Sequence, residues 1–190
     1  NATNQLGEEV RNRLLRRVDW RFLLPTPEPG KSICFAHGLL RRAVRFISDR
    51  MANEKLDSAS TDCDVAVAIS PNRATLRKCW SALRPGGSCY TEWYSPLGGG
   101  PNGVRRRLEA AGFEHIRCYW AWPWPCLSRP RFWLPLEAPG AVDYFLLSRP
   151  PAPTAVRRVA AVGLRALWLL SLRLRLTVPL CGIAHKPGVR

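Results

Sequence analysis

The chain has 190 residues, of which 46% are hydrophobic and 9% aromatic, so its composition excludes an intrinsically disordered protein. This length suits a single domain with a sizeable core. The formal charge of +15 favours anionic partners: a nucleic acid, an acidic membrane surface or a phosphorylated ligand. A GC-rich genome would produce the same excess of arginine without any functional cause.

The seven cysteines show no C-x-x-C or Cys/His ligand spacing, so we expect no metal site. Several of them stand in apolar runs, where a thiol behaves as a small hydrophobe, and reduced thiols favour a cytoplasmic protein. No signal peptide is visible, although the chain begins with Asn. No run reaches the roughly 18 uncharged apolar residues of a membrane span. Peripheral attachment to a membrane is the alternative location.

The front of the chain predicts a helix, a proline-rich lead-in and a strand. Residues 6–18 have the pattern of a basic amphipathic helix, and the three prolines up to residue 30 exclude helix there. The apolar run at 31–38 predicts a buried strand that ends at Gly38. Residues 39–56 favour a helix that runs into a short extended piece.

Residues 63–122 alternate between strand and helix. The continuous apolar run at 63–70 is typical of a parallel sheet covered on both faces. Ser70 or Asn72 caps the next helix, "RPGG" ends it, and "SCYTEWY" forms the following strand. A second helix ends at Gly112 before the strand "FEHIRCYWAW". This order predicts an α/β doubly wound, mostly parallel sheet with right-handed crossovers.

The remaining chain changes character. Residues 123–153 are rich in Pro and Trp, and residues 154–176 predict an amphipathic helix with arginines over half its circumference. We expect one domain over residues 1–190. Its parts are the N-terminal helix and lead-in (1–30), the α/β core (31–125), a helical, Pro/Trp-rich insertion or lid (126–176), and the last strand with a basic tail (177–190).

The block from 63 to 122 resembles the C-terminal half of a class I S-adenosylmethionine-dependent methyltransferase. That family has a strand of the form "FDVVVA", a helix, "LRPGG", a strand, a helix ending L-x-x-A-G-F and a further strand. Here "CDVAVA", "LRPGG" and "LEAAGF" fill those places, and "CGIAHKP" resembles the family's last strand. The resemblance implies a Rossmann-like fold with S-adenosylmethionine as cofactor.

The resemblance also places the cofactor at the carboxyl ends of the first strands, at the topological switch point. The family has a Gly-rich loop there, whereas "ICFAHG" offers one glycine, and the segment that follows is short. The site is therefore either degenerate or a compact variant. Asp49 is the acid assigned to the ribose hydroxyls, with a solvated charge on a helix as the alternative. The residues assigned to the cofactor are His37, Gly38, Asp49, Asp64 and Ser70.

Glu92, Trp120 and Trp122 are assigned to the acceptor side, because they end predicted strands or cluster just beyond them. The alternatives are a solvent-facing glutamate and a tryptophan-rich core edge. Methyl transfer chiefly requires alignment of the two reactants, so no catalytic acid or base is assigned.

Three functions remain open from the sequence. The first is a methyltransferase acting on a small-molecule or lipid-like acceptor, in solution or at an anionic membrane surface. The second is a non-catalytic binding or scaffold protein that keeps the fold. The third is a basic nucleic-acid-binding protein, which is less favoured because the arginines are dispersed and no recognised motif accompanies them.

Overall fold

The computed structural model describes residues 2–53, 62–94, 100–122, 125, 131–138, 141, 144–145 and 179–188. The helices are α1 (Ala2–Arg17), the 3-10 helix η1 (Asp19–Leu23), α2 (Gly38–Ile47), α3 (Arg73–Ala82) and α4 (Gly100–Glu109). The strands are β1 (Lys31–Phe35), β2 (Arg50–Met51), β3 (Cys63–Ile69), β4 (Leu83–Trp93), β5 (Glu114–Trp122), β6 (Phe132–Pro135) and β7 (Leu180–His185).

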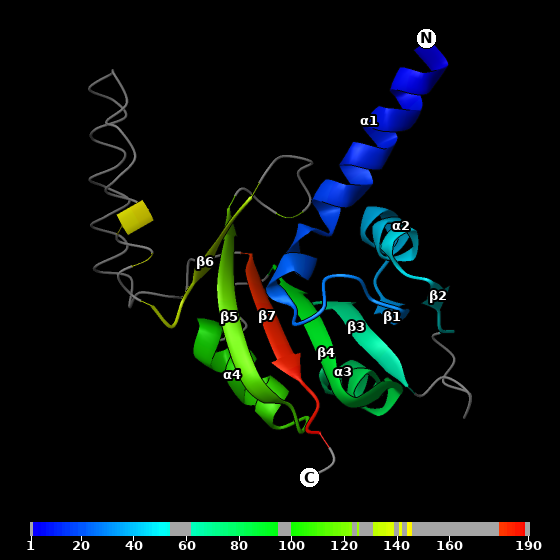
Figure 1. Ribbon diagram of the computed structural model, residues 1–190. Helices are drawn as coiled ribbons and strands as arrows, with labels where there is room; N and C mark the ends of the chain where they lie inside the picture. Colours follow the sequence, from blue (N-terminus) through cyan, green and yellow to red (C-terminus); the bar gives the residue numbers. More distant parts are fainter. Residues whose placement is uncertain are drawn as a thin grey trace, which may run out of the picture.

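These strands form one sheet in the order β2-β1-β3-β4-β7-β5-β6 (Figure 1). β2, β1, β3 and β4 pair in parallel, and β7 is antiparallel to both of its neighbours, β4 and β5. β5 therefore runs in the same direction as β4, and only β6 and β7 oppose it. The predicted mostly parallel, Rossmann-like α/β sheet is confirmed.

Helices cover both faces of the sheet (Figure 1). On one face α3 and α4 bury Leu76 and Leu108 against the strands. On the other face the end of α1, η1 and α2 bury Val18, Trp20 and Val44 in a second cluster. The doubly wound arrangement follows from these two cores, because each strand contributes alternate side chains to opposite faces.

The "RPGG" segment has the geometric role that the sequence predicts, but it belongs to a strand. β4 begins at Leu83 and continues through the motif, with an irregular register against the start of β3. Gly86 has φ of +76°, a conformation that glycine adopts at little cost. A Cβ on Gly87 would lie 2.9 Å from the carbonyl oxygen of Arg84, so this position also excludes a side chain.

One other element differs from the sequence predictions. The region expected to be a helical insertion contains the strand β6, which pairs antiparallel with β5. Its Pro135 is tolerated because β6 lies at the sheet edge, where one side needs no hydrogen-bond donors. The predicted helix at 154–176 lies outside the described residues, as does most of the insertion.

Candidate functional site

The topological switch point lies between the carboxyl ends of β1 and β3. The chain passes from β1 to β2 on one side, whereas β3 pairs with β1 on the other. Phe35 pairs with Ala68, so the two strands end side by side. Ligands of open α/β sheets bind in the crevice outside such strand ends.

His37 and Gly38 occupy this point after β1. His37 is the N-cap residue of α2, with an extended backbone, and its side chain makes no capping hydrogen bond. Gly38 has φ of +64°, and a Cβ placed there would meet nothing within 4 Å. Both residues are exposed, so the amino end of α2 and its partial positive charge are accessible from this edge.

Ser70 stands at the end of β3 on the same edge. Its backbone is in the left-handed region, with φ of +43°, and its N–H donates to the carbonyl oxygen of Glu92 at 2.6 Å. A non-glycine residue in this conformation is uncommon and is held there by its surroundings. The structure therefore brings His37, Gly38 and Ser70 to one edge, as the sequence predicts.

Glu92 is on that edge but is fully buried, which agrees neither with its assignment to the acceptor side nor with the alternative of a solvent-facing side chain. Arg17 of α1 donates to its two oxygens at 2.6 and 2.7 Å. The hydroxyls of Tyr90 and Tyr94 donate to the same carboxylate at 2.9 and 2.6 Å. Because its oxygens already accept four hydrogen bonds, Glu92 is a clamp for the N-terminal helix and does not reach a substrate.

Electrostatics keep Arg17 charged and the phenols of Tyr90 and Tyr94 neutral. Burial and the charge of Glu92 raise the pKa of Tyr94, and burial raises the pKa of Tyr90. Burial opposes the charge of Arg17, but the hydrogen bonds and charge of Glu92 outweigh it and raise the arginine pKa. Neither phenol is therefore a proton acceptor near neutral pH.

Residues 17–20 fix the N-terminal segment in two further places. Trp20 stacks on Tyr90 with ring centroids 4.2 Å apart and planes 7° apart. Asp19 accepts a hydrogen bond of 2.6 Å from Arg131, just before β6. The contacts by which residues 17–20 fix the N-terminal segment were not predicted from the sequence. One feature of the sequence could have indicated a buried ion pair. Arg17 follows Leu14 by three residues and therefore lies on the apolar side of the helix, where a charged side chain needs a buried partner.

Asp49 and Asp64 do not join the switch point, contrary to their assignment. Asp64 is the second residue of β3, and its Oδ2 accepts the N–H of Lys31 at 2.7 Å. Asp49 precedes β2, and its Oδ2 would lie 3.8 Å from a Cβ on Gly30. Residues that begin parallel strands lie at the amino edge of the sheet, so both carboxylates are on the edge opposite to Gly38.

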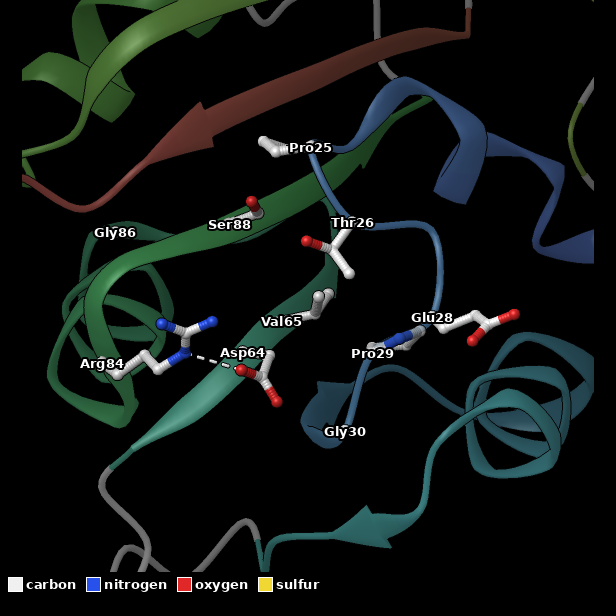
Figure 2. A pocket seen from close by; sticks show the side chains of 10 residues that line it. All are labelled: Pro25, Thr26, Glu28, Pro29, Gly30, Asp64, Val65, Arg84, Gly86 and Ser88. Carbon is white, nitrogen blue, oxygen red and sulfur yellow. Dashed lines mark hydrogen bonds and ion pairs between the residues drawn. The ribbon is translucent and has the colours of Figure 1, made fainter.

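The amino edge carries a cavity of about 100 Å³ below the proline-rich lead-in (Figure 2). Asp64 contributes to it, and its Oδ1 accepts from Nε of Arg84 at 2.6 Å. Burial acts in the opposite direction, but the Lys31 amide and Arg84 lower the pKa of Asp64. The lining residues are Pro25, Thr26, Glu28, Pro29, Gly30, Asp64, Val65, Arg84, Gly86 and Ser88.

Trp120 and Trp122 lie near the carboxyl end of β5, with ring centroids 5.6 Å apart. β4 and β7 separate this strand from β3, so the two rings are remote from the switch point. Trp120 also contacts the ring of Phe145 at 6.4 Å. These contacts agree with the alternative of an aromatic edge to the core.

Neither a metal site nor a membrane span is found in the part of the chain that the structure describes. No three His, Cys, Asp or Glu side chains lie there in an arrangement that could hold a metal ion. None of the described helices combines the length and apolar character required to cross a bilayer.

Comparison with known proteins gives structural likenesses alone. No protein-family model and no curated protein matches the chain. A methyltransferase of Thermotoga maritima has 10% identity and a TM-score of 0.47, covering 98% of this chain and 94% of its own. A methyltransferase of Archaeoglobus fulgidus has 14% identity and a TM-score of 0.48, covering 98% and 100%. The [4+2]-cyclase SpnF has 15% identity and a TM-score of 0.47, covering 94% and 81%.

With identities of 10–15% and TM-scores below 0.5, these likenesses carry no information about the reaction. The fold itself rests on the strand, helix and "LRPGG" order that the sequence predicts and the structure contains. The chain has a Rossmann-like α/β fold, with a mostly parallel sheet covered by helices on both faces.

Proposed function

We propose that the chain binds S-adenosylmethionine at the carboxyl edge between β1 and β3 and transfers its methyl group to a small neutral acceptor. The observation that carries this proposal is the juxtaposition of His37, Gly38 and Ser70 at the switch point. All three are exposed, whereas the neighbouring end of β4 is filled by the buried Glu92 cluster.

The loop residues fit the carboxylate end of this cofactor. Gly38 leaves open space at the amino end of α2, where a ligand carboxylate would accept backbone N–H groups. The Ser70 hydroxyl is exposed beside it as a further donor or acceptor. The fit is incomplete on the ribose side, because the described residues after β2 are Ala52 and Asn53, and neither is acidic.

When bound, the cofactor supplies a methyl group already activated by its sulfonium. The chain's own residues would hold the two reactants in line and exclude water. Tyr94 stands partly exposed at the end of β4, but its hydroxyl proton is held by Glu92 and its pKa is raised. Because Tyr94 keeps its proton, the proposed acceptor is one that brings its own lone pair, such as a neutral amine.

A second candidate is a binding or scaffold protein that keeps the fold without the cofactor. Its support is the single glycine after β1, together with the missing acid among the described residues after β2. A nucleic-acid-binding role has weaker support, because the exposed arginines of the described helices are spread over α1, α2, α3 and α4.

Calorimetric titration with S-adenosylmethionine and S-adenosylhomocysteine separates the first two candidates. Gly38→Asn adds a side chain at the switch point, and Asn is among the residues that tolerate a positive φ. We expect it to weaken binding by about tenfold or more, the loss that one steric or hydrogen-bond conflict produces. Asp49→Ala, at the opposite edge, is the matched control and should bind as the wild type does.

Two outcomes contradict the proposal. If the wild-type protein binds neither ligand at millimolar concentration, the methyltransferase proposal is wrong and the scaffold function is favoured. Binding that survives Gly38→Asn but is lost in Asp49→Ala would move the site to the amino edge.

A further inference from the structure

The cavity under the lead-in lies on the amino edge of the sheet, away from the switch point. Three separate segments enclose its volume of about 100 Å³: residues 25–30, the start of β3 and the "RPGG" part of β4. Figure 2 shows Thr26 and Arg84 on opposite sides of this space, with Val65 and Ser88 between them. Neither the proposed cofactor site nor the Glu92 cluster uses any of these side chains.

Arg84 presents unused donors to the cavity. Its Nε donates to Oδ1 of Asp64 at 2.6 Å. Figure 2 shows its two terminal nitrogens turned away from that carboxylate and toward the enclosed space. The side chain is about half exposed, at 52%, so a ligand can reach it. A guanidinium held through Nε offers the remaining N–H groups as a planar fork, the arrangement that suits an oxyanion.

Of the two carboxylates that line the cavity, one is fully hydrogen-bonded and the other points away. Both oxygens of Asp64 are engaged, one by Arg84 and the other by the N–H of Lys31 at 2.7 Å. The carboxylate of Glu28 points away from the cavity in Figure 2, whereas the hydroxyl of Thr26 points into it. The groups that face the space therefore include the arginine fork and one hydroxyl.

The frame that holds Arg84 is rigid. The N–H of Gly86 donates to the carbonyl oxygen of Lys186 at 3.0 Å, and Ser88 Oγ lies 3.0 Å from Nδ1 of His185. These contacts tie the motif to the end of β7. Because Asp64 also accepts the backbone N–H of Lys31, the carboxylate that holds Nε of Arg84 is itself fixed before any ligand arrives.

We propose that this cavity binds a small oxyanion, a single phosphate or carboxylate group, between Arg84 and Thr26. The cavity volume of about 100 Å³ is well above the roughly 10–15 Å³ that one water molecule requires, so the cavity has room for one such group. The inference goes beyond the proposed function and does not depend on it, because the site lies on the other edge of the sheet. It also gives the arginine of "LRPGG" a role besides the geometric role of the two glycines.

The test titrates the purified chain with inorganic phosphate and, separately, with acetate, and follows both thermal unfolding and calorimetric heat. Sodium chloride keeps the ionic strength constant, so that general screening does not contribute. A ligand that binds only the folded state raises Tm with concentration. We expect saturable binding of one of the two anions. Stronger phosphate binding assigns the site to phosphate esters, and stronger acetate binding assigns it to carboxylates.

Three variants test whether the anion binds between Arg84 and Thr26. Arg84→Gln should weaken anion binding by about tenfold or more, the range for loss of a charge-assisted hydrogen bond. Thr26→Val keeps the Asp64–Arg84 pair and should weaken anion binding several-fold. This variant still tests the site if Arg84→Gln folds poorly. Arg77→Gln removes an exposed arginine of α3 and is the matched control, with unchanged binding.

The proposal is overturned if neither anion shifts Tm beyond chloride at equal ionic strength. It is equally overturned if anion binding is retained in both Arg84→Gln and Thr26→Val, or is lost to the same extent in Arg77→Gln.

Discussion

The buried pair of Arg17 and Glu92 should dominate the stability of the N-terminal segment. Glu92→Leu leaves the guanidinium of Arg17, which is 4% exposed, without its partner and removes the acceptor of Tyr90 and Tyr94. Breaking a buried ion pair from one side costs about 3–5 kcal/mol. Since the whole free energy of unfolding of a domain is about 5–15 kcal/mol, the variant should lose about a fifth of it or more.

A double-mutant cycle measures the pair itself. Arg17→Met combined with Glu92→Leu removes both charges, and well-packed apolar replacements of such pairs are often neutral or stabilising. We therefore expect the double variant to be more stable than Glu92→Leu alone, with a coupling energy of about 2 kcal/mol or more. Urea unfolding followed by circular dichroism gives the four free energies of the cycle.

The exposed pair of Arg105 and Glu137, 3.0 Å apart and 41% and 37% exposed, supplies the comparison. Solvent screens such a pair, so Arg105→Met should cost less than about 1 kcal/mol. The reasoning is refuted if the Arg17 and Glu92 substitutions add within about 0.5 kcal/mol, because additivity is the behaviour of groups that do not interact.

Three further predictions concern local features. Asn72→Ala should cost about 1 kcal/mol in urea unfolding, because its side chain caps α3, and an unchanged midpoint would contradict that role. Gly87→Ala should destabilise more than Gly86→Ala, since the first places a Cβ against two backbone oxygens, whereas the second adds only the strain of a positive φ in open space; the reverse order of Tm would refute this. Burial lowers the pKa of His185 below its usual 6.5, so between that lowered pKa and 6.5 the unfolded state binds more protons. Stability should therefore fall as pH decreases from about 7 into this window, and His185→Asn should flatten the fall; an equal slope in both proteins contradicts it.

The elements between residues 63 and 122 could be predicted because their signals are local. Each buried strand is a continuous apolar run, and the helices between them carry caps or stops, such as Asn72 and Gly112. The same reasoning placed His37, Gly38 and Ser70 together, because parallel strands that are neighbours end at one edge.

The parts that the sequence did not predict depend on long-range pairing. Arg17 and Glu92 are 75 residues apart in the sequence, and no local sequence pattern predicts their contact. Asp64 was assigned to the wrong edge because the acidic residue begins its strand and does not end it. β6 was missed because its four residues form a strand only through the hydrogen bonds that β5 supplies.

The position of β7 has a consequence for how the chain reaches its folded state during synthesis. β4 and β5 do not pair with each other, and β7 joins them. Until residue 185 has left the ribosome, the two halves of the sheet each present an unpaired edge, and such edges recruit other strands. A nascent or truncated chain that lacks 180–185 is therefore a natural target for chaperones, and completion of β7 closes both edges in one step.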